Sequence, residues 1–238
     1  MFSRLAVVPH PPLLVPELVS GAVPEAEQVR AECLAAARDL AAHAPDWVAV
    51  GVHPSGPRTL DGVAGTFAGF GVDVRVALTE DTADTADTGK AVDPDLPLPA
   101  LVAGWLRQRA GARRVRVHLV PPDLPPAECL ALGARLADEA RPGQALLVLG
   151  DGSHRHGELA VGRPDERAGA FDEDVRRALA AADVDALRAL DPDLAAELGA
   201  DGRAAWQVAA GVPGAWRCAR SAFLAPFGVG YHCAVWEA

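Results

Sequence analysis

Short apolar runs alternate with longer stretches of helical periodicity along this chain, and this alternation restricts the possible folds more than any other feature. The apolar runs predict strands at Arg4–Val8, Trp47–Val52, Val72–Ala77, Val115–Val120, Ala145–Gly150 and Val229–Trp236. Apolar residues at three- and four-residue spacing predict amphipathic helices at Glu25–Ala42, Pro99–Gln108 and Pro126–Arg141. This order is typical of crossover units, so we expect an α/β fold with a central, mostly parallel or mixed β-sheet flanked by helices.

The length favours one domain over residues 1–238, because a chain of 238 residues, half of them hydrophobic, can bury one large core. The segment Thr79–Pro97 is rich in Asp, Thr and Pro and is expected to be an exposed loop, with a substrate lid as the alternative. The segment Phe171–Val212 is expected to be helical, with breaks around Asp191-Pro192 and Gly199–Gly202, and to pack beside the site.

Charge and segment lengths exclude several classes of partner. A formal charge of −10, with no dense basic run among 22 Lys and Arg residues, argues against nucleic acid. No apolar segment approaches the ~20 residues that cross a bilayer, and the start of the chain does not resemble an export signal. The scattered cysteines Cys33, Cys129, Cys218 and Cys233 suit a reducing compartment. We therefore expect a soluble, cytoplasmic protein without a membrane or nucleic-acid partner.

Three histidines follow predicted strands. His10 follows the first strand, His53 the second and His154 the fifth, in the contexts VVPHPPLL, VGVHPSGP and LGDGSHRHG. Because ligands of open α/β sheets bind beyond the carboxyl ends of the strands, we expect these side chains to converge on one metal-centred site. A neutral imidazole binds divalent metals, and its pKa near neutrality also suits proton transfer. The alternative for each histidine is a structural hydrogen bond to a loop carbonyl.

The remaining histidines and the serines are assigned other roles. His43 closes a helix and His118 lies within a strand, so both are interpreted as structural, and His232 as a core residue. Asp151, Ser153 and His156 lie beside His154 and are candidate substrate contacts. Ser55 and Ser153 lack the strained turn of a nucleophilic serine, and the glycines after the fifth strand lack dinucleotide-loop spacing.

The histidine motifs, together with the opening VVPHPPLLVPE and the closing FGVGYHCAVWEA, resemble the class III extradiol dioxygenase superfamily, the LigB-like proteins, and more distantly the Memo-like proteins. The resemblance implies that His10 and His53 bind Fe(II) and that His154 is the catalytic acid/base. It also implies a carboxylate ligand at the start of a helix before a tryptophan. The segment GADGRAAW offers Asp201 before Trp206, although aspartate replaces glutamate and a one-residue gap is needed; Glu197 is the competing candidate.

Two imidazoles and one carboxylate with open positions are also the ligand set of non-haem Fe(II) oxygen chemistry. The first hypothesis is therefore an extradiol dioxygenase, or a related oxidoreductase, that consumes dioxygen and a small catecholic aromatic. A metal-dependent hydrolase, with Zn in place of iron and Asp151 orienting His154, is the second hypothesis. A non-catalytic binding or scaffold protein is the third. Trp206 and Trp216 are expected in the core, with the interface of a homo-oligomer as the alternative.

Overall fold

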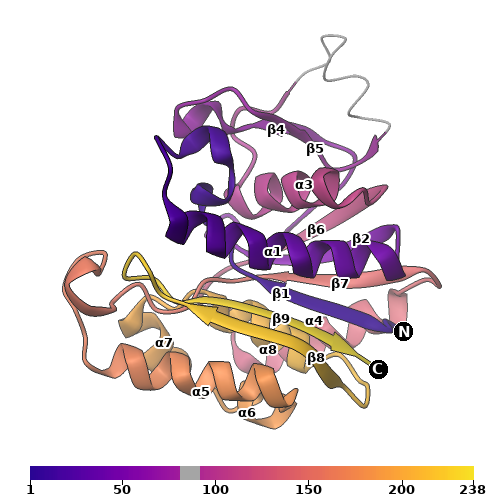
Figure 1. Ribbon diagram of the computed structural model, residues 1–238. Coiled ribbons are helices and arrows are strands. Elements are labelled where there is room, and N and C mark those ends of the chain that lie inside the picture. Colours follow the sequence, from indigo (N-terminus) through magenta and orange to yellow (C-terminus); the bar gives the residue numbers. More distant parts are fainter. Residues whose placement is uncertain (81–91) are drawn as a thin grey trace.

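Seven strands form the central sheet of the computed structural model, which describes residues 1–80 and 92–238 (Figure 1). Their order across the sheet is β3 (Arg58–Leu60), β6 (Arg114–Val120), β2 (Asp46–Val52), β7 (Gln144–Leu149), β1 (Arg4–Val8), β9 (Tyr231–Glu237) and β8 (Arg217–Leu224). The four central strands β6, β2, β7 and β1 are parallel, and the edge strands β3, β9 and β8 pair antiparallel. The expected α/β fold with a mixed sheet is confirmed.

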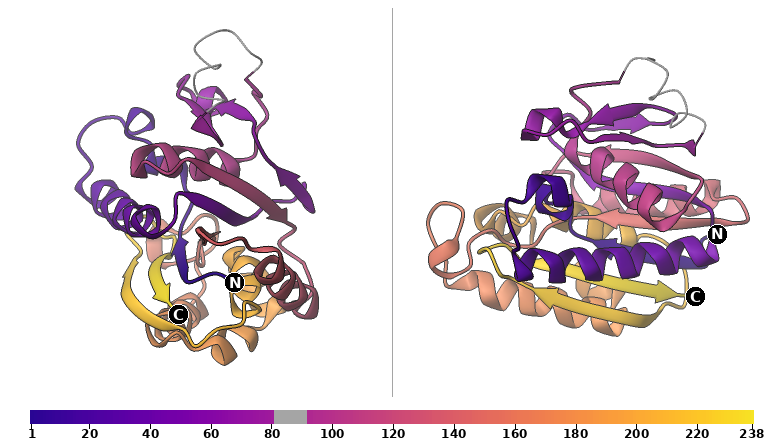
Figure 2. Two further views of the ribbon diagram at one scale, coloured as in Figure 1. Left: turned by 90° about the vertical axis from the view of Figure 1, so that its right-hand side faces the viewer. Right: turned by 45° about the horizontal axis from the view of Figure 1, so that its top comes forward.

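Helices cover both faces of the sheet. The helices α1 (Pro24–His43) and α3 (Leu98–Ala110) pack on one face, and α4 (Pro126–Glu139), α5 (Arg167–Ala181) and α8 (Gly202–Ala210) pack on the other. The short helices α6 (Val184–Arg188) and α7 (Pro192–Leu198) contact α5 and α8 (Figure 2). Among the described residues no helix is both long and apolar enough to cross a membrane.

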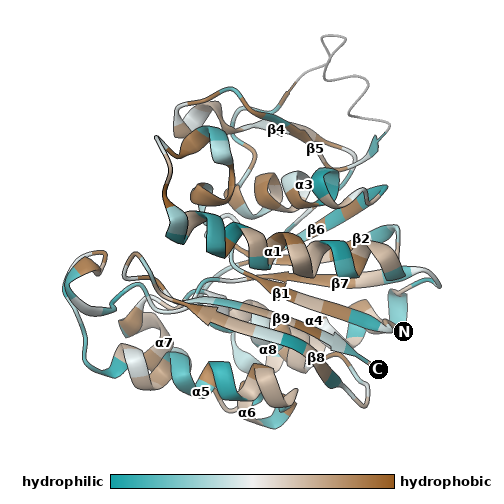
Figure 3. Ribbon diagram, viewed as in Figure 1, coloured by the Kyte–Doolittle hydropathy of each residue, from teal (hydrophilic) through white to brown (hydrophobic). Residues whose placement is uncertain are grey.

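The two faces of the sheet enclose two hydrophobic clusters. Along β1, Ala6 and Val8 belong to the cluster under α1 and α3, whereas Leu5 and Val7 belong to the cluster on the opposite face. Both faces of a central parallel strand are buried, so its sequence is continuously apolar. In Figure 3 the inner strands are mainly brown, whereas the helices carry both brown and teal residues. Trp206 is fully buried on the α8 side, which confirms its expected place in the core.

Some elements differ from the expectations. The expected strand Val72–Ala77 is shortened to β5 (Arg75–Ala77), and it pairs with β4 (Ala64–Thr66) in a separate two-stranded sheet rather than in the central one. The strands β3, β4 and β8 have no counterpart among the expected strands. β8 is an edge strand without a buried residue, so its sequence lacks the apolar signal of the inner strands.

The two long segments also differ in detail. The expected helical stretch Phe171–Val212 begins earlier, at Arg167, and it breaks additionally before α6, where the Asp183 carboxylate accepts hydrogen bonds from the backbone N–H groups of Asp185 and Ala186. Within the segment Thr79–Pro97, residues 81–91 lie outside the described part of the chain. Thr79 and Leu96 at its ends are buried, so the ends of the segment belong to the fold rather than to an exposed loop. Short 3₁₀ turns occur at Pro12–Leu14, Pro16–Leu18, Phe67–Phe70 and Gly157–Leu159.

The crossing of α4 and α8 depends on a glycine. A Cβ at Gly133 of α4 would lie 2.0 Å from the carbonyl oxygen of Val208 in α8. We expect Gly133→Ala to lower the free energy of unfolding by about 3 kcal/mol, because backbone cannot yield as a flexible side chain can. Gly169→Ala in α5 is the matched control, since its Cβ would meet nothing within 4 Å. Urea denaturation of both variants measures the difference, and equal midpoints would contradict the prediction.

Candidate functional site

The strand order brings the predicted site residues to one edge of the sheet. β7 lies between β2 and β1 and pairs parallel with both, so the three strands end at the same edge. His53 directly follows β2, His10 follows β1 by two residues, and Asp151 and His154 lie on the loop after β7. Both termini lie at the right in Figure 1, where β1 begins, so these residues belong to the opposite end of the sheet.

His10 is held by Asp151. The backbone N–H of His10 donates a 2.9 Å hydrogen bond to Asp151 Oδ1, and the same oxygen lies 3.8 Å from His10 Nδ1. The His10 side chain is 11% exposed, and within residues 1–80 and 92–238 its buried Nδ1 atom has no hydrogen-bond partner. A buried ring nitrogen without a partner is costly unless something binds it.

His53 lies within electrostatic range of His10. Burial lowers the pKa of His53 below its ordinary value, and the charge of His10 lowers it further. Its Nδ1 atom lies 2.8 Å from the hydroxyl of Ser55, and the backbone N–H of Ser55 donates to the same nitrogen at 3.2 Å. Ser55 therefore orients the ring of His53, and both structural contacts use the same ring nitrogen.

His154 is oriented by its own loop and by the end of α7. Its Nδ1 atom lies 3.1 Å from the carbonyl oxygen of Val161. A carbonyl oxygen only accepts, so Nδ1 carries the proton in the neutral ring and Nε2 keeps the lone pair. Nε2 faces Gly199, where an added Cβ would lie only 1.9 Å away. The contact with Val161 thus leaves His154 as a base at Nε2.

The close contact with Gly199 allows a specific test of how His154 is placed. Gly199 ends α7 with φ +62°, and Gly111 ends α3 with φ +76° and open space around its Cβ position. Alanine at either position should cost about 1 kcal/mol for the left-handed backbone. Only Gly199→Ala should also displace the His154 ring, which we expect as shifted ring signals in ¹H–¹⁵N NMR spectra. Unshifted signals in Gly199→Ala would contradict the contact.

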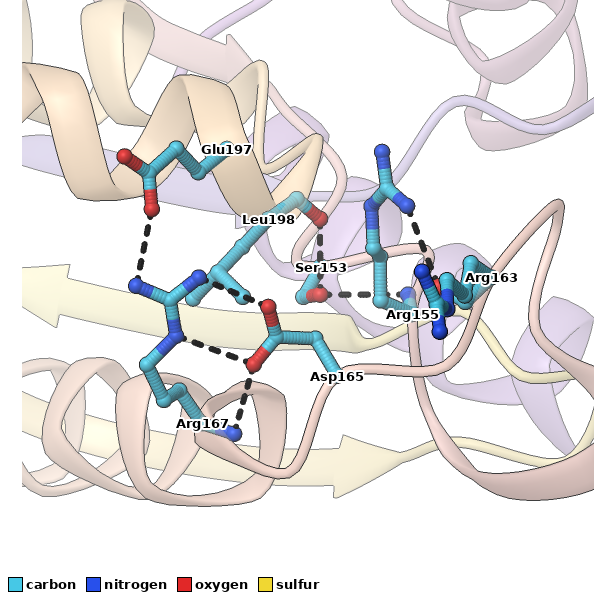
Figure 4. A network of polar contacts seen from close by, with 7 residues as sticks. All are labelled: Ser153, Arg155, Arg163, Asp165, Arg167, Glu197 and Leu198. Atoms are coloured by element: carbon cyan, nitrogen blue, oxygen red, sulfur yellow. Dashed lines mark hydrogen bonds and ion pairs between the residues drawn. The ribbon is translucent and has the colours of Figure 1, made fainter.

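Two carboxylates were candidates for the third ligand, and they lie in different surroundings. Asp201 directly precedes α8, and its side chain makes no capping hydrogen bond to that helix. Asp201 is exposed when the whole residue is considered, but the protein atoms around its carboxyl group shield that group from water and raise its pKa above the ordinary value. The nearby charges of His154 and His10 act in the opposite direction without cancelling this effect. Glu197 instead forms an ion pair with Arg167 at 2.7 Å (Figure 4). Asp201 is thus the carboxylate that lies near the imidazoles.

The three candidate substrate contacts are engaged in different ways. Asp151 contacts His10, and this contact differs from the orienting contact with His154 that the hydrolase hypothesis expects. Ser153 is fully buried; its hydroxyl donates to the carbonyl oxygen of Leu198 at 2.8 Å and accepts from the Arg155 backbone N–H at 3.1 Å (Figure 4). The Ser153 hydroxyl therefore holds the loop in place rather than facing a ligand.

His156 binds Asp172, a residue that is not among the predicted site residues. Its Nε2 atom donates to Asp172 Oδ2 at 2.5 Å, and Asp172 is fully buried in α5. One signal for Asp172 exists in the sequence: an aspartate lies on a helix face whose neighbours Ala168, Val175 and Leu179 are apolar. A charge on an apolar helix face needs a buried partner.

The other histidines fit their expected structural roles. His43 ends α1 and contacts Arg4, and His118 in β6 lies 3.2 Å from the Thr59 hydroxyl. His232 in β9 is buried, with its ring 4.7 Å from that of Phe223.

The site can be compared with what a metal ion needs. Within residues 1–80 and 92–238, no group of three His, Cys, Asp or Glu side chains stands close enough to hold a metal ion without rearrangement. The donor types nevertheless fit Fe(II): two imidazoles within electrostatic range of each other, one of them with an unpartnered buried nitrogen, and a carboxylate near His10. These side chains have the donor atoms that Fe(II) prefers and lie at the same edge of the sheet. Metal binding would require them to turn toward one another.

Comparison with known proteins supports the fold. No family model matches the chain, and no curated protein matches its sequence. Solved structures with a similar fold include the crystal structure of an uncharacterized protein, JW3007, from Escherichia coli K12. The similarity covers 99% of this chain and 100% of that one, with a TM-score of 0.55 and 11% sequence identity. At this identity the likeness concerns the fold alone.

Proposed function

We propose that this protein is a non-haem Fe(II)-dependent extradiol-type dioxygenase that cleaves a small catecholic aromatic ring. The observation that carries the proposal is the placement of His10, His53 and His154 at the carboxyl ends of three adjacent parallel strands, with Asp201 nearby. The motifs around these histidines are similar to those of the class III extradiol dioxygenases. His10, His53 and Asp201 would hold the metal, which when bound supplies positions for both catechol oxygens and for dioxygen.

The protein side chains supply the proton transfers. His154 has its Nδ1 proton directed to the Val161 carbonyl, so Nε2, which packs against Gly199, keeps the lone pair that would accept a phenolic proton and return it to the product. Asp151 fixes the backbone of His10, which limits the orientations that the His10 ring can take. These roles require no residue outside the loops that follow β1, β2 and β7 and the start of α8.

A cavity next to Asp201 suits a small substrate. It has a volume of about 460 Å³ and lies between the loop after β6 and the helices α7 and α8, with Pro122, Pro192 and Ala196 in its wall. Pockets for small ligands fall in the range of about 300–1,000 Å³ and are mainly apolar, so a single aromatic ring fits this space. Asp201 belongs to the same wall, whereas His10, His53 and His154 do not line this cavity, so a ring bound there would lie beside the proposed carboxylate ligand but not against the three imidazoles.

The decisive experiment combines metal analysis with oxygen consumption. Protein purified without added metal is analysed for iron and zinc, reconstituted anaerobically with Fe(II), and mixed with a panel of catechols in an oxygen electrode. We expect one dioxygen consumed for each catechol, and a product that is heavier than the catechol by two oxygen atoms. Fe(II)-loaded protein that consumes no oxygen with any catechol would contradict the proposal, and anaerobic turnover of esters or amides with zinc would favour a hydrolase.

A further inference from the structure

A fully buried carboxylate, Asp172 of α5, accepts hydrogen bonds from three donors, two on the loop after β7 and one on β9. Asp172 Oδ2 accepts from His156 Nε2 at 2.5 Å and from the Ser153 backbone N–H at 3.1 Å, and Oδ1 accepts from His232 Nε2 at 2.9 Å. Burial alone would raise the pKa of Asp172, but the hydrogen bonds from the two histidines keep it below its ordinary value. Asp172 is therefore an ionised group whose position is set by three hydrogen bonds.

Backbone closes around this carboxylate on two sides. A Cβ at Gly152 would lie 2.4 Å from Asp172 Oδ1, and a Cβ at Gly230 would lie 2.3 Å from Oδ2. Two backbone hydrogen bonds join the segments that carry these glycines. Gly152 N–H donates to the Gly230 carbonyl at 2.7 Å, and Gly230 N–H donates to the Ser153 carbonyl at 2.8 Å. The loop after β7 is thus fastened to the turn before β9 with the Asp172 carboxylate at the junction.

The fastened loop is the one that carries two residues of the proposed site. Asp151 and His154 flank the pair Gly152 and Ser153, both of which contact Asp172 or adjoin it. Ser153 also donates its hydroxyl proton to the carbonyl oxygen of Leu198, which precedes Gly199, the residue against which His154 packs. A displacement at Asp172 would therefore reach His154 through its neighbour in sequence and through the end of α7.

We infer that Asp172 is a positioning residue for the proposed site: by binding Ser153, His156 and His232 together, it sets the position of the loop that presents Asp151 and His154. The inference rests on the proposed function for the chemistry of His154, and it adds to that function a residue that touches neither metal nor substrate. His232 lies 60 residues from Asp172 in the sequence, so its hydrogen bond to Asp172 also connects β9 to α5.

The test uses Asp172→Asn, which keeps the shape of the side chain but removes its charge and one acceptor. We expect the His154 ring signals and the backbone amides of Gly152 and Ser153 to shift in ¹H–¹⁵N NMR spectra. In the iron-loaded enzyme, kcat should fall by about 10- to 100-fold with little change in KM or iron content, as expected for a misplacement of about 1 Å. Asp174→Asn is the control, because Asp174 is an exposed residue of the same helix that forms a 3.4 Å ion pair with Arg177.

A second variant keeps the inference testable if Asp172→Asn does not fold. His156→Ala removes one donor at a half-buried position and leaves Ser153 and His232 bound to Asp172, so we expect smaller shifts in the same signals. A folded Asp172→Asn or His156→Ala protein with wild-type His154 signals would overturn the inference. The NMR readout needs no activity, so wild-type protein without dioxygenase activity would refute the proposed function while the positioning role is still decided by the spectra.

Discussion

Alanine in place of His10 or His53 is expected to abolish stoichiometric metal binding. Each substitution removes one of the two imidazoles that would bind the metal. Removing a residue that only hydrogen-bonds to a metal ligand lowers the affinity for the metal by roughly 10- to 100-fold, so removing a ligand itself should lower it further. His10 Nδ1 makes no hydrogen bond with any described residue, so we expect the fold to survive the loss of the ring. Metal content by mass spectrometry, with circular dichroism to verify folding, measures the effect.

His118→Ala is the matched control for this prediction. His118 lies on β6, next to β2 in the same sheet, and its ring contacts Thr59 rather than the site. It should retain as much metal as the wild type. If His10→Ala and His53→Ala, both folded, also retain one equivalent, then the two histidines do not share an ion and the proposed metal centre is wrong.

His154→Ala is expected to separate chemistry from metal binding. General acid/base catalysis contributes about 10²–10⁴-fold to a rate, so kcat should fall by that factor while the iron content stays at the wild-type value. The side chain is only partly buried and contacts Val161 and Gly199, so its removal should cost little stability. Steady-state oxygen consumption at saturating catechol gives the change in kcat.

Rescue by added imidazole is the control for the His154 variant. A small base that diffuses into the space vacated by the ring should restore part of the rate in His154→Ala and leave the rate of His10→Ala unchanged, because His10→Ala lacks the metal. Wild-type turnover by His154→Ala would show that another group transfers the proton. Loss of iron together with activity would instead make His154 a ligand.

Much of the architecture is readable from the sequence because the central strands are buried on both faces. Arg4–Val8 is predicted at its observed bounds, and β2, β6 and β7 are predicted within one residue at each end. Such strands are marked by local apolar runs. The exposed edge strand β8 and the short strands β3 and β4 carry no comparable local signal, and they were missed.

The candidate site divides in the same way. The positions of His10, His53 and His154 after strands are visible locally, and so are the prolines that follow His10 and His53. The choice between Asp201 and Glu197 was open in sequence, because both lie near the break between two helices. Arg167, which engages Glu197, is 30 residues away in the chain, so only the packing of α5 against α7 decides between them.

The inner strands, the long helices and the histidines that follow strands are readable from the residues alone, because these properties follow from the pattern of neighbouring residues. The position of β7 between β1 and β2, the hydrogen bond from the His10 backbone to Asp151 across 141 residues, and the burial of Asp172 among donors from two distant segments depend on the tertiary fold. Hydrogen-bond and ion-pair partners are selected by distance in space, and no local pattern encodes that distance.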